Sequence, residues 1–185
     1  MARREQQWVV VLRAVNVGGT GRMTMADLRS VVHGAGFPDA TTHIQSGNLL
    51  LGAAGPGPAI EAAIESAIAA ELGFSTQAMV RTAAQMRTLA DASPHPDDAD
   101  PSRIGIGFCK TRPAAAAVRA LAARDFGHDR AEVRGAECVL WYPDGMGRSK
   151  MTGAALERVL GVALTVRNLK VTRALAELAS APSRS

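Results

Sequence analysis

The pattern of apolar residues gives the same order of strands and helices twice along the chain, and this repetition constrains the fold more than any other feature. In the first half, period-two segments predict strands and a period near 3.6 predicts helices: strands at about 8–14, 40–45, 48–51 and 76–81, helices at about 24–35 and 58–73. The second half repeats the order: strands at about 103–109, 131–134, 137–142 and 162–167, helices at about 113–123 and 149–160. Each half therefore has the βαββαβ order of a ferredoxin-like unit.

We expect an α+β fold of two tandem ferredoxin-like units with antiparallel sheets, each followed by a trailing helix. Val80-Arg81-Thr82 and Val166-Arg167-Asn168 end the two halves alike, with a small polar residue placed to cap that helix. Residues 92–102 are rich in Pro and Asp and have no apolar period, which predicts a linker between domains 1–91 and 103–185. A single sheet assembled from both halves is the alternative.

Composition narrows the class of protein. A chain of 185 residues with 47% apolar residues can bury a full core. The net charge is +4, but 21 basic residues are scattered among 17 acidic ones and aromatic residues make up only 4%, which disfavours a nucleic-acid-binding track. The sequence contains neither a signal-peptide core nor an apolar span of membrane length, so we expect a cytoplasmic protein.

The two cysteines, Cys109 and Cys138, have neither CxxC spacing nor clustered histidines. We therefore expect no metal site and no cofactor. The strand order predicts that the two thiols lie near each other, reduced and buried as small apolar residues.

A glycine-rich turn from Asn16 to Arg22 joins the first strand to a helix that begins near Thr24. A strand, a glycine loop and a helix N-terminus in this order expose backbone N–H groups to an anion. The βαββαβ order places this turn beside the polar hairpin at residues 45–48, so the two loops are expected to converge. The structural alternative is a pair of tight turns whose side chains satisfy their own backbone.

A second polar cluster occupies residues 143–150, before a helix for which Ser149 is the expected N-cap. In the same topology Arg167 and Asn168 lie at the edge of the sheet that Arg148 and Lys150 could reach. The alternative is a solvated basic turn. The pattern leaves open whether the two clusters form one site.

At these positions the sequence resembles a bacterial family known as domain of unknown function 1697. The matching segments are residues 12–19, 25–29, 44–48, 80–82, 147–151 and 165–168. The resemblance covers nearly the whole chain and implies a shared fold. Because the family has no established activity, it marks positions without supplying a substrate.

We expect the chain to bind a small anionic molecule, phosphorylated or carboxylated, at these loops, as a binding protein or as an enzyme. No residue stands out as a general base. The candidate ligand-binding residues are Arg13, Asn16, Gly18, Gly19, Arg22, Gln45, Ser46, Gly47, Asn48, Arg148, Ser149, Lys150, Arg167 and Asn168. The alternative is a protein-interaction or homodimerisation module that uses the edge strands or the bare glycine face of residues 104–108.

Overall fold

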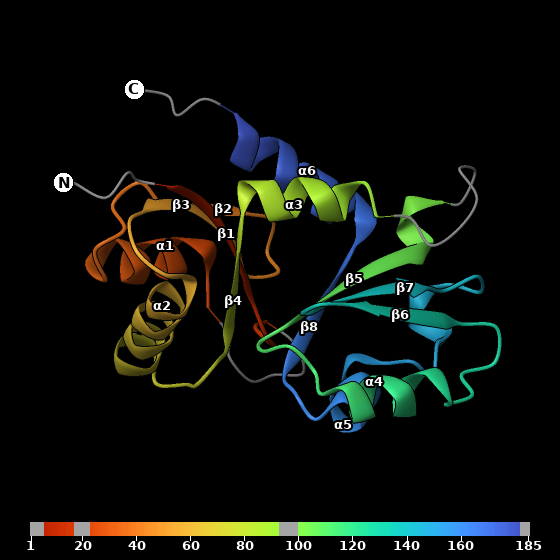
Figure 1. Ribbon diagram of the computed structural model, residues 1–185. Coiled ribbons are helices and arrows are strands. Elements are labelled where there is room, and N and C mark those ends of the chain that lie inside the picture. Colours follow the sequence, from red (N-terminus) through yellow and green to blue (C-terminus); the bar gives the residue numbers. More distant parts are fainter. Residues whose placement is uncertain (1–5, 17–22, 93–99, 182–185) are drawn as a thin grey trace. The chain divides into compact units, whose positions relative to one another are not determined.

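The computed structural model describes residues 6–16, 23–92 and 100–181, which form an α+β fold with two four-stranded antiparallel sheets and six α-helices (Figure 1). Within this part of the chain, each sheet is built from strands of one half. The alternative of one sheet shared by both halves is therefore wrong.

The first sheet has the strand order β2-β3-β1-β4. Its strands are β1 (Gln6–Leu12), β2 (Thr41–His43), β3 (Asn48–Ala53) and β4 (Ala78–Thr82). β1 lies inside the sheet because its valine-rich run favours a strand and is buried on both faces. Val10 pairs with Leu49 of β3 and with Val80 of β4.

Two helices, α1 (Met25–Gly34) and α2 (Gly57–Leu72), cover one face of the first sheet (Figure 1). Leu28 of α1 and Ile64 of α2 are fully buried in a core with the side chains of that sheet face. Thr24 caps α1, and α2 ends at Gly73 in the left-handed conformation. Both boundaries agree with the sequence prediction.

The second sheet has the equivalent order β6-β7-β5-β8. Its strands are β5 (Ile104–Cys109), β6 (Arg130–Arg134), β7 (Glu137–Trp141) and β8 (Leu164–Asn168). The glycine face of β5 is closely packed: a Cβ atom on Gly105 would lie 3.0 Å from Val166, and one on Gly107 would lie 3.1 Å from Cys138. Side chains of the same sheet therefore fill the space beside these glycines.

The helices α4 (Ala115–Ala122) and α5 (Gly153–Leu160) cover one face of the second sheet. The expected start of α5 near Ser149 is wrong, because a 3-10 turn, η2 (Met146–Arg148), comes first and Thr152 caps the helix. In the core, the Sγ atoms of Cys109 and Cys138 lie 3.9 Å apart, which confirms that the thiols are close. The hydrogen bond with Cys109, together with burial, raises the pKa of the Cys138 thiol.

The helices α3 (Ala83–Ala90) and α6 (Leu169–Ser180) follow β4 and β8, and a 3-10 turn, η1 (Pro101–Arg103), precedes β5. The chain divides into unit 1, residues 1–87 with 175–185, and unit 2, residues 88–174. This division falls within α3 and within α6, whereas the sequence places the boundary at residues 92–102. No helix among the described residues has the length and hydropathy needed to cross a membrane.

Candidate functional site

The two polar loops of unit 1 converge, as the strand order predicts. The Leu12 N–H donates to the Gly47 carbonyl at 2.8 Å, and the Asn16 side-chain amide donates to the Gln45 carbonyl at 3.4 Å. The candidate residues Gly18, Gly19 and Arg22 lie outside the described residues.

The asparagine side chains of these loops are engaged in holding the loops themselves. Asn16 Oδ1 accepts a hydrogen bond from the Met23 N–H at 2.9 Å, so one side chain bridges both loops. Asn48 is fully buried, and its amide donates to the His43 carbonyl at 3.1 Å and to Ser46 Oγ at 2.8 Å. These bonds favour the interpretation that Asn16, Ser46 and Asn48 shape the turns.

Backbone strain is concentrated in the same two loops. Among the described residues, the non-glycine residues with positive φ are Ala14, Asn16 and Ile44. Asparagine adopts this conformation readily, but a β-branched residue such as Ile44 does so at a cost. Such residues persist only where the surrounding structure holds them, and here the bonds between the loops do so.

A depression of about 500 Å³ beside these loops is lined by Asn16, Gln45 and residues at the start of α1. The helix start is already capped: Asp27 Oδ2 accepts from the Thr24 N–H at 3.1 Å and from Thr24 Oγ1 at 2.8 Å. These bonds lower the pKa of Asp27, so an ionised carboxylate stands where an anion would approach. Among the described lining residues there is no cation.

Arg13 is fixed through its backbone. Its N–H donates to the Gln77 carbonyl at 2.9 Å, and its carbonyl accepts from Thr76 Oγ1 at 2.7 Å. The side chain is half-buried and does not line the depression of unit 1.

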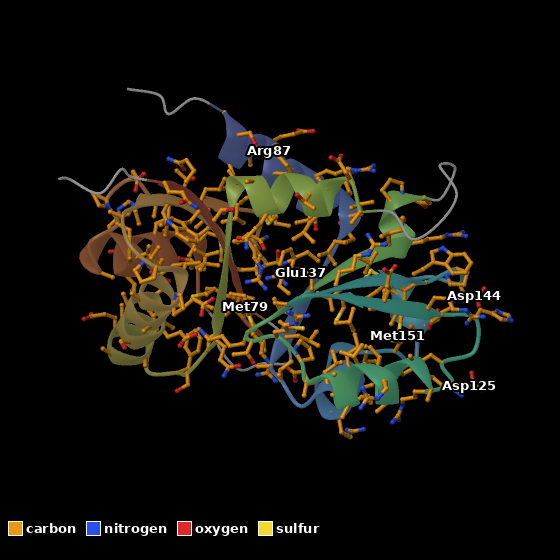
Figure 2. All side chains as sticks on the ribbon, viewed as in Figure 1. Met79, Arg87, Asp125, Glu137, Asp144 and Met151 are labelled. Carbon is orange, nitrogen blue, oxygen red and sulfur yellow. The ribbon has the colours of Figure 1, made fainter. Side chains whose placement is uncertain are left out.

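Unit 2 contains a second depression, of about 350 Å³. Two connections form it: residues 125–129 between α4 and β6, and residues 144–150 between β7 and α5. Figure 2 labels Asp125 and Asp144 on these two connections. The β7–α5 connection spans residues 142–152, whereas residues 54–56 suffice for the corresponding β3–α2 connection of unit 1. The longer connection is not needed to complete a βαββαβ sheet, and such loops often carry function.

Two side-chain pairs tie the connections together. Ser149 Oγ donates to Asp129 Oδ2 at 2.5 Å, and it accepts from the Met151 N–H at 2.8 Å. His128 Nδ1 lies 3.1 Å from Asp144 Oδ2. These ties hold the two walls of the depression against each other.

Tyr142, at the start of the β7–α5 connection, forms a hydrogen bond with a residue near the end of that connection. Its hydroxyl donates to the Met151 carbonyl at 3.2 Å. Burial, with a smaller contribution from the charge of Asp129, raises the pKa of Tyr142. The phenol is therefore a neutral donor at physiological pH.

The depression holds charged side chains of both signs. Asp125 accepts from the Gly127 N–H at 2.8 Å, and Asp129 and Asp144 are engaged as described above. The exposed side chains of Arg148 and Lys150 have no hydrogen-bond or ion-pair partner among the described residues. The depression therefore presents two cations without a side-chain partner beside three hydrogen-bonded carboxylates.

The remaining two candidates, Arg167 and Asn168, do not line this depression. Arg167 donates to Thr165 Oγ1 at 2.8 Å and to the Val166 carbonyl at 3.1 Å, and burial lowers its pKa to about 10. Asn168 Oδ1 accepts from the Val171 N–H at 2.8 Å and so caps α6. The structure therefore brings Arg148, Ser149 and Lys150 together without Arg167 and Asn168.

Asp144 lies in the polar cluster 143–150 that the sequence predicts, but neither it nor His128 is among the predicted ligand-binding residues. The two residues are sixteen positions apart. Only the pairing of β6 with β7 brings the loops together, so no local spacing could reveal the pair. In the described residues, no group of three or more His, Cys, Asp or Glu is arranged to hold a metal ion.

Comparison with known proteins places the chain in a family. Residues 6–138 match the model of a protein family described as a protein of unknown function (DUF1697). Among solved structures, the chain is similar to the conserved bacterial protein SP0830 from Streptococcus pneumoniae, with a TM-score of 0.68 and 16% identity over 95% of this chain and 99% of that one. This similarity concerns the fold. No curated protein matches the chain.

Proposed function

The chain belongs to the DUF1697 family of proteins of unknown function, and from that premise we propose that it binds a small anionic molecule, phosphorylated or carboxylated, in the depression of unit 2. The observation that carries the proposal is the pair of unpartnered cations, Arg148 and Lys150, at a concave surface of about 350 Å³. A depression of this size accommodates a small ligand. Ser149 lies between the two cations, and its bond to Asp129 fixes the segment that presents them.

The same reasoning argues against the depression of unit 1 as the anion site. Its described lining residues include no cation, and its asparagine is engaged in the loops. We propose that the described residues of the unit 1 loops serve the fold and that ligand binding belongs to unit 2.

We further propose that the two units are ferredoxin-like repeats derived by duplication, and that the protein acts in the cytoplasm. Equivalent hydrogen bonds support the duplication: Leu12 donates to Gly47 in unit 1, and Cys109 donates to Ala136 at the same point in unit 2. The free cysteines Cys109 and Cys138 suit a reducing compartment.

The test of the proposal is thermal stabilisation of the full chain by inorganic phosphate, sugar phosphates, nucleotides and dicarboxylic acids. A specific ligand at a hundredfold excess over its Kd stabilises by about 2.7 kcal/mol. The double variant Arg148→Gln/Lys150→Gln is expected to lose most of that stabilisation, because a charge-assisted contact contributes about 1.5 to 3 kcal/mol.

The matched control is Arg158→Gln, which removes an exposed arginine of α5 that does not line the depression. It should respond to ligand like the unsubstituted chain. Equal loss of stabilisation in the control and the double variant would indicate non-specific charge effects. That outcome would contradict the proposed site.

A further inference from the structure

The depression of unit 2 contains a histidine held by a carboxylate. His128 comes from the α4–β6 connection and Asp144 from the β7–α5 connection, and Nδ1 of the first lies 3.1 Å from Oδ2 of the second. Both side chains are exposed, at 81% and 68%. An exposed pair of this kind contributes little to the free energy of unfolding, and its effect is to join the two connections and to orient the histidine ring.

The pair fixes which nitrogen of His128 is free to react. A carboxylate accepts hydrogen bonds, so the tautomer that suits this contact is the one in which Nδ1–H donates to Asp144. In the neutral ring Nε2 is then unprotonated and is able to accept a proton. This is the arrangement in which an aspartate orients a histidine for general base catalysis.

Arg148, Lys150 and this histidine line one depression. From that juxtaposition we propose that the anion bound there is a phosphate ester and that His128 is the general base for its hydrolysis, with Asp144 as a positioning residue. The inference rests on the proposed anion binding. The proposed ligands are phosphorylated or carboxylated molecules. Of these, only a phosphate ester has, at its charged group, a bond that water hydrolyses when a general base activates it.

The reaction needs no reactant other than water. A water oxygen forms a bond to phosphorus while His128 Nε2 takes a proton from that water, and the bond between phosphorus and the ester oxygen breaks. The imidazolium releases its proton to solvent, and the alkoxide takes a proton from water, giving an alcohol and inorganic phosphate. Arg148 and Lys150 offset charge on the phosphoryl oxygens during the transfer.

The experiment measures hydrolysis of 4-nitrophenyl phosphate by the full chain, alongside calorimetric binding of 4-nitrobenzylphosphonate, which cannot be hydrolysed. His128→Gln is expected to lower kcat by about 100-fold or more, the usual contribution of a general base. Binding of the phosphonate should stay within about twofold, because the cations are unchanged. Asp144→Asn should lower kcat and alter its pH profile. His33→Gln, which removes an exposed histidine of unit 1, should leave both measurements unchanged.

A second variant separates catalysis from folding. In His128→Gly, added imidazole should restore turnover, whereas a purely structural defect would not respond to it. If the chain binds the phosphonate and hydrolyses nothing, or if His128→Gln keeps full activity, the assignment of a general base is overturned and anion binding stands. If the phosphonate does not bind, the proposed function fails for phosphorylated ligands, and this inference fails with it.

Discussion

At the scale of single residues, Gly47 explains why the loops of unit 1 require glycine. Its φ is +70°, and a Cβ atom there would overlap Val15 and lie 3.0 Å from the Leu12 Cβ. Its carbonyl accepts the hydrogen bond from the Leu12 N–H. The glycine is therefore required by packing between the two loops, without any ligand.

Replacing Gly47 by alanine should lower the free energy of unfolding by more than about 2 kcal/mol, because left-handed strain and overpacking add. Gly34→Ala is the control, since a Cβ atom at this last residue of α1 meets nothing within 4 Å. It should be neutral or stabilise by up to about 1 kcal/mol. Urea denaturation measures both, and a Gly47→Ala chain as stable as the unsubstituted one would contradict the packing role.

At the scale of elements, glutamates of α2 and α5 bond N–H groups of the edge strands β4 and β8 of their own unit. Glu61 and Glu65 of α2 accept from the N–H groups of Val80 and Ala78, at 2.9 and 2.7 Å, along β4. Glu157 of α5 accepts from Leu164 at the start of β8 at 2.9 Å. Strand N–H groups satisfied in this way are not available to pair with another chain.

The role of Glu61 is tested by two substitutions. Glu61→Gln keeps an oxygen that accepts from Val80, so its stability should stay within about 1 kcal/mol. Glu61→Leu removes the acceptor and leaves a buried N–H group unsatisfied, which should cost about 1 to 3 kcal/mol. Chemical denaturation compares the two, and equal stability of both variants would show that the hydrogen bond to β4 does not matter.

Tyr142, in the β7–α5 connection, should make the stability of the protein depend on pH. Tyr142→Phe removes the bond to the Met151 carbonyl and should cost about 1 kcal/mol at pH 8. Because the folded-state pKa of Tyr142 is raised, the folded chain retains the phenol proton where the unfolded chain loses it. The stability contributed by Tyr142 is therefore complete below about pH 10, the ordinary tyrosine pKa, and declines above it.

The measurement is the difference in unfolding free energy between the unsubstituted chain and Tyr142→Phe at pH 8 and at pH 10.5. The difference should shrink at the higher pH. A difference that stays constant or grows would mean that Tyr142 is not held as a neutral donor.

At the scale of the whole molecule, unit 1 is built from both ends of the chain. The end of α6 belongs to it, and Leu175, Ala176 and Ala179 of that helix are buried. Within the same unit, Arg87 of α3 donates to Ser180 Oγ at 3.1 Å. The C-terminal turns of α6 therefore belong to unit 1, which also contains the N-terminal half of the chain.

A chain that ends at Ala174 should be destabilised, since losing the burial of Leu175 alone costs about 1.5 to 3 kcal/mol. Hydrogen exchange should show reduced protection of the amides at residues 78–87. Two independent linear domains would instead leave protection at those residues unchanged.

Interactions between residues that are close in sequence made most of the fold predictable. The capping box at Thr24, the end of α2 at Gly73 and the strand periods follow from neighbouring residues alone. The start of α5 did not follow, because Ser149 bonds to Asp129 of another loop instead of capping the helix. The His128–Asp144 pair and the place of the last residues in unit 1 also depend on contacts distant in sequence.

Locating the bound anion is the most direct test of the account. Backbone amide spectra of the full chain, recorded during a titration with inorganic phosphate or with the best ligand from the stability screen, report which residues respond. If the anion binds in unit 2, the amide resonances of residues 125–129 and 144–150 should shift saturably. The double variant Arg148→Gln/Lys150→Gln should show no such shifts. Saturable shifts confined to residues 12–16 and 44–48 would contradict the account and return the site to the loops of unit 1.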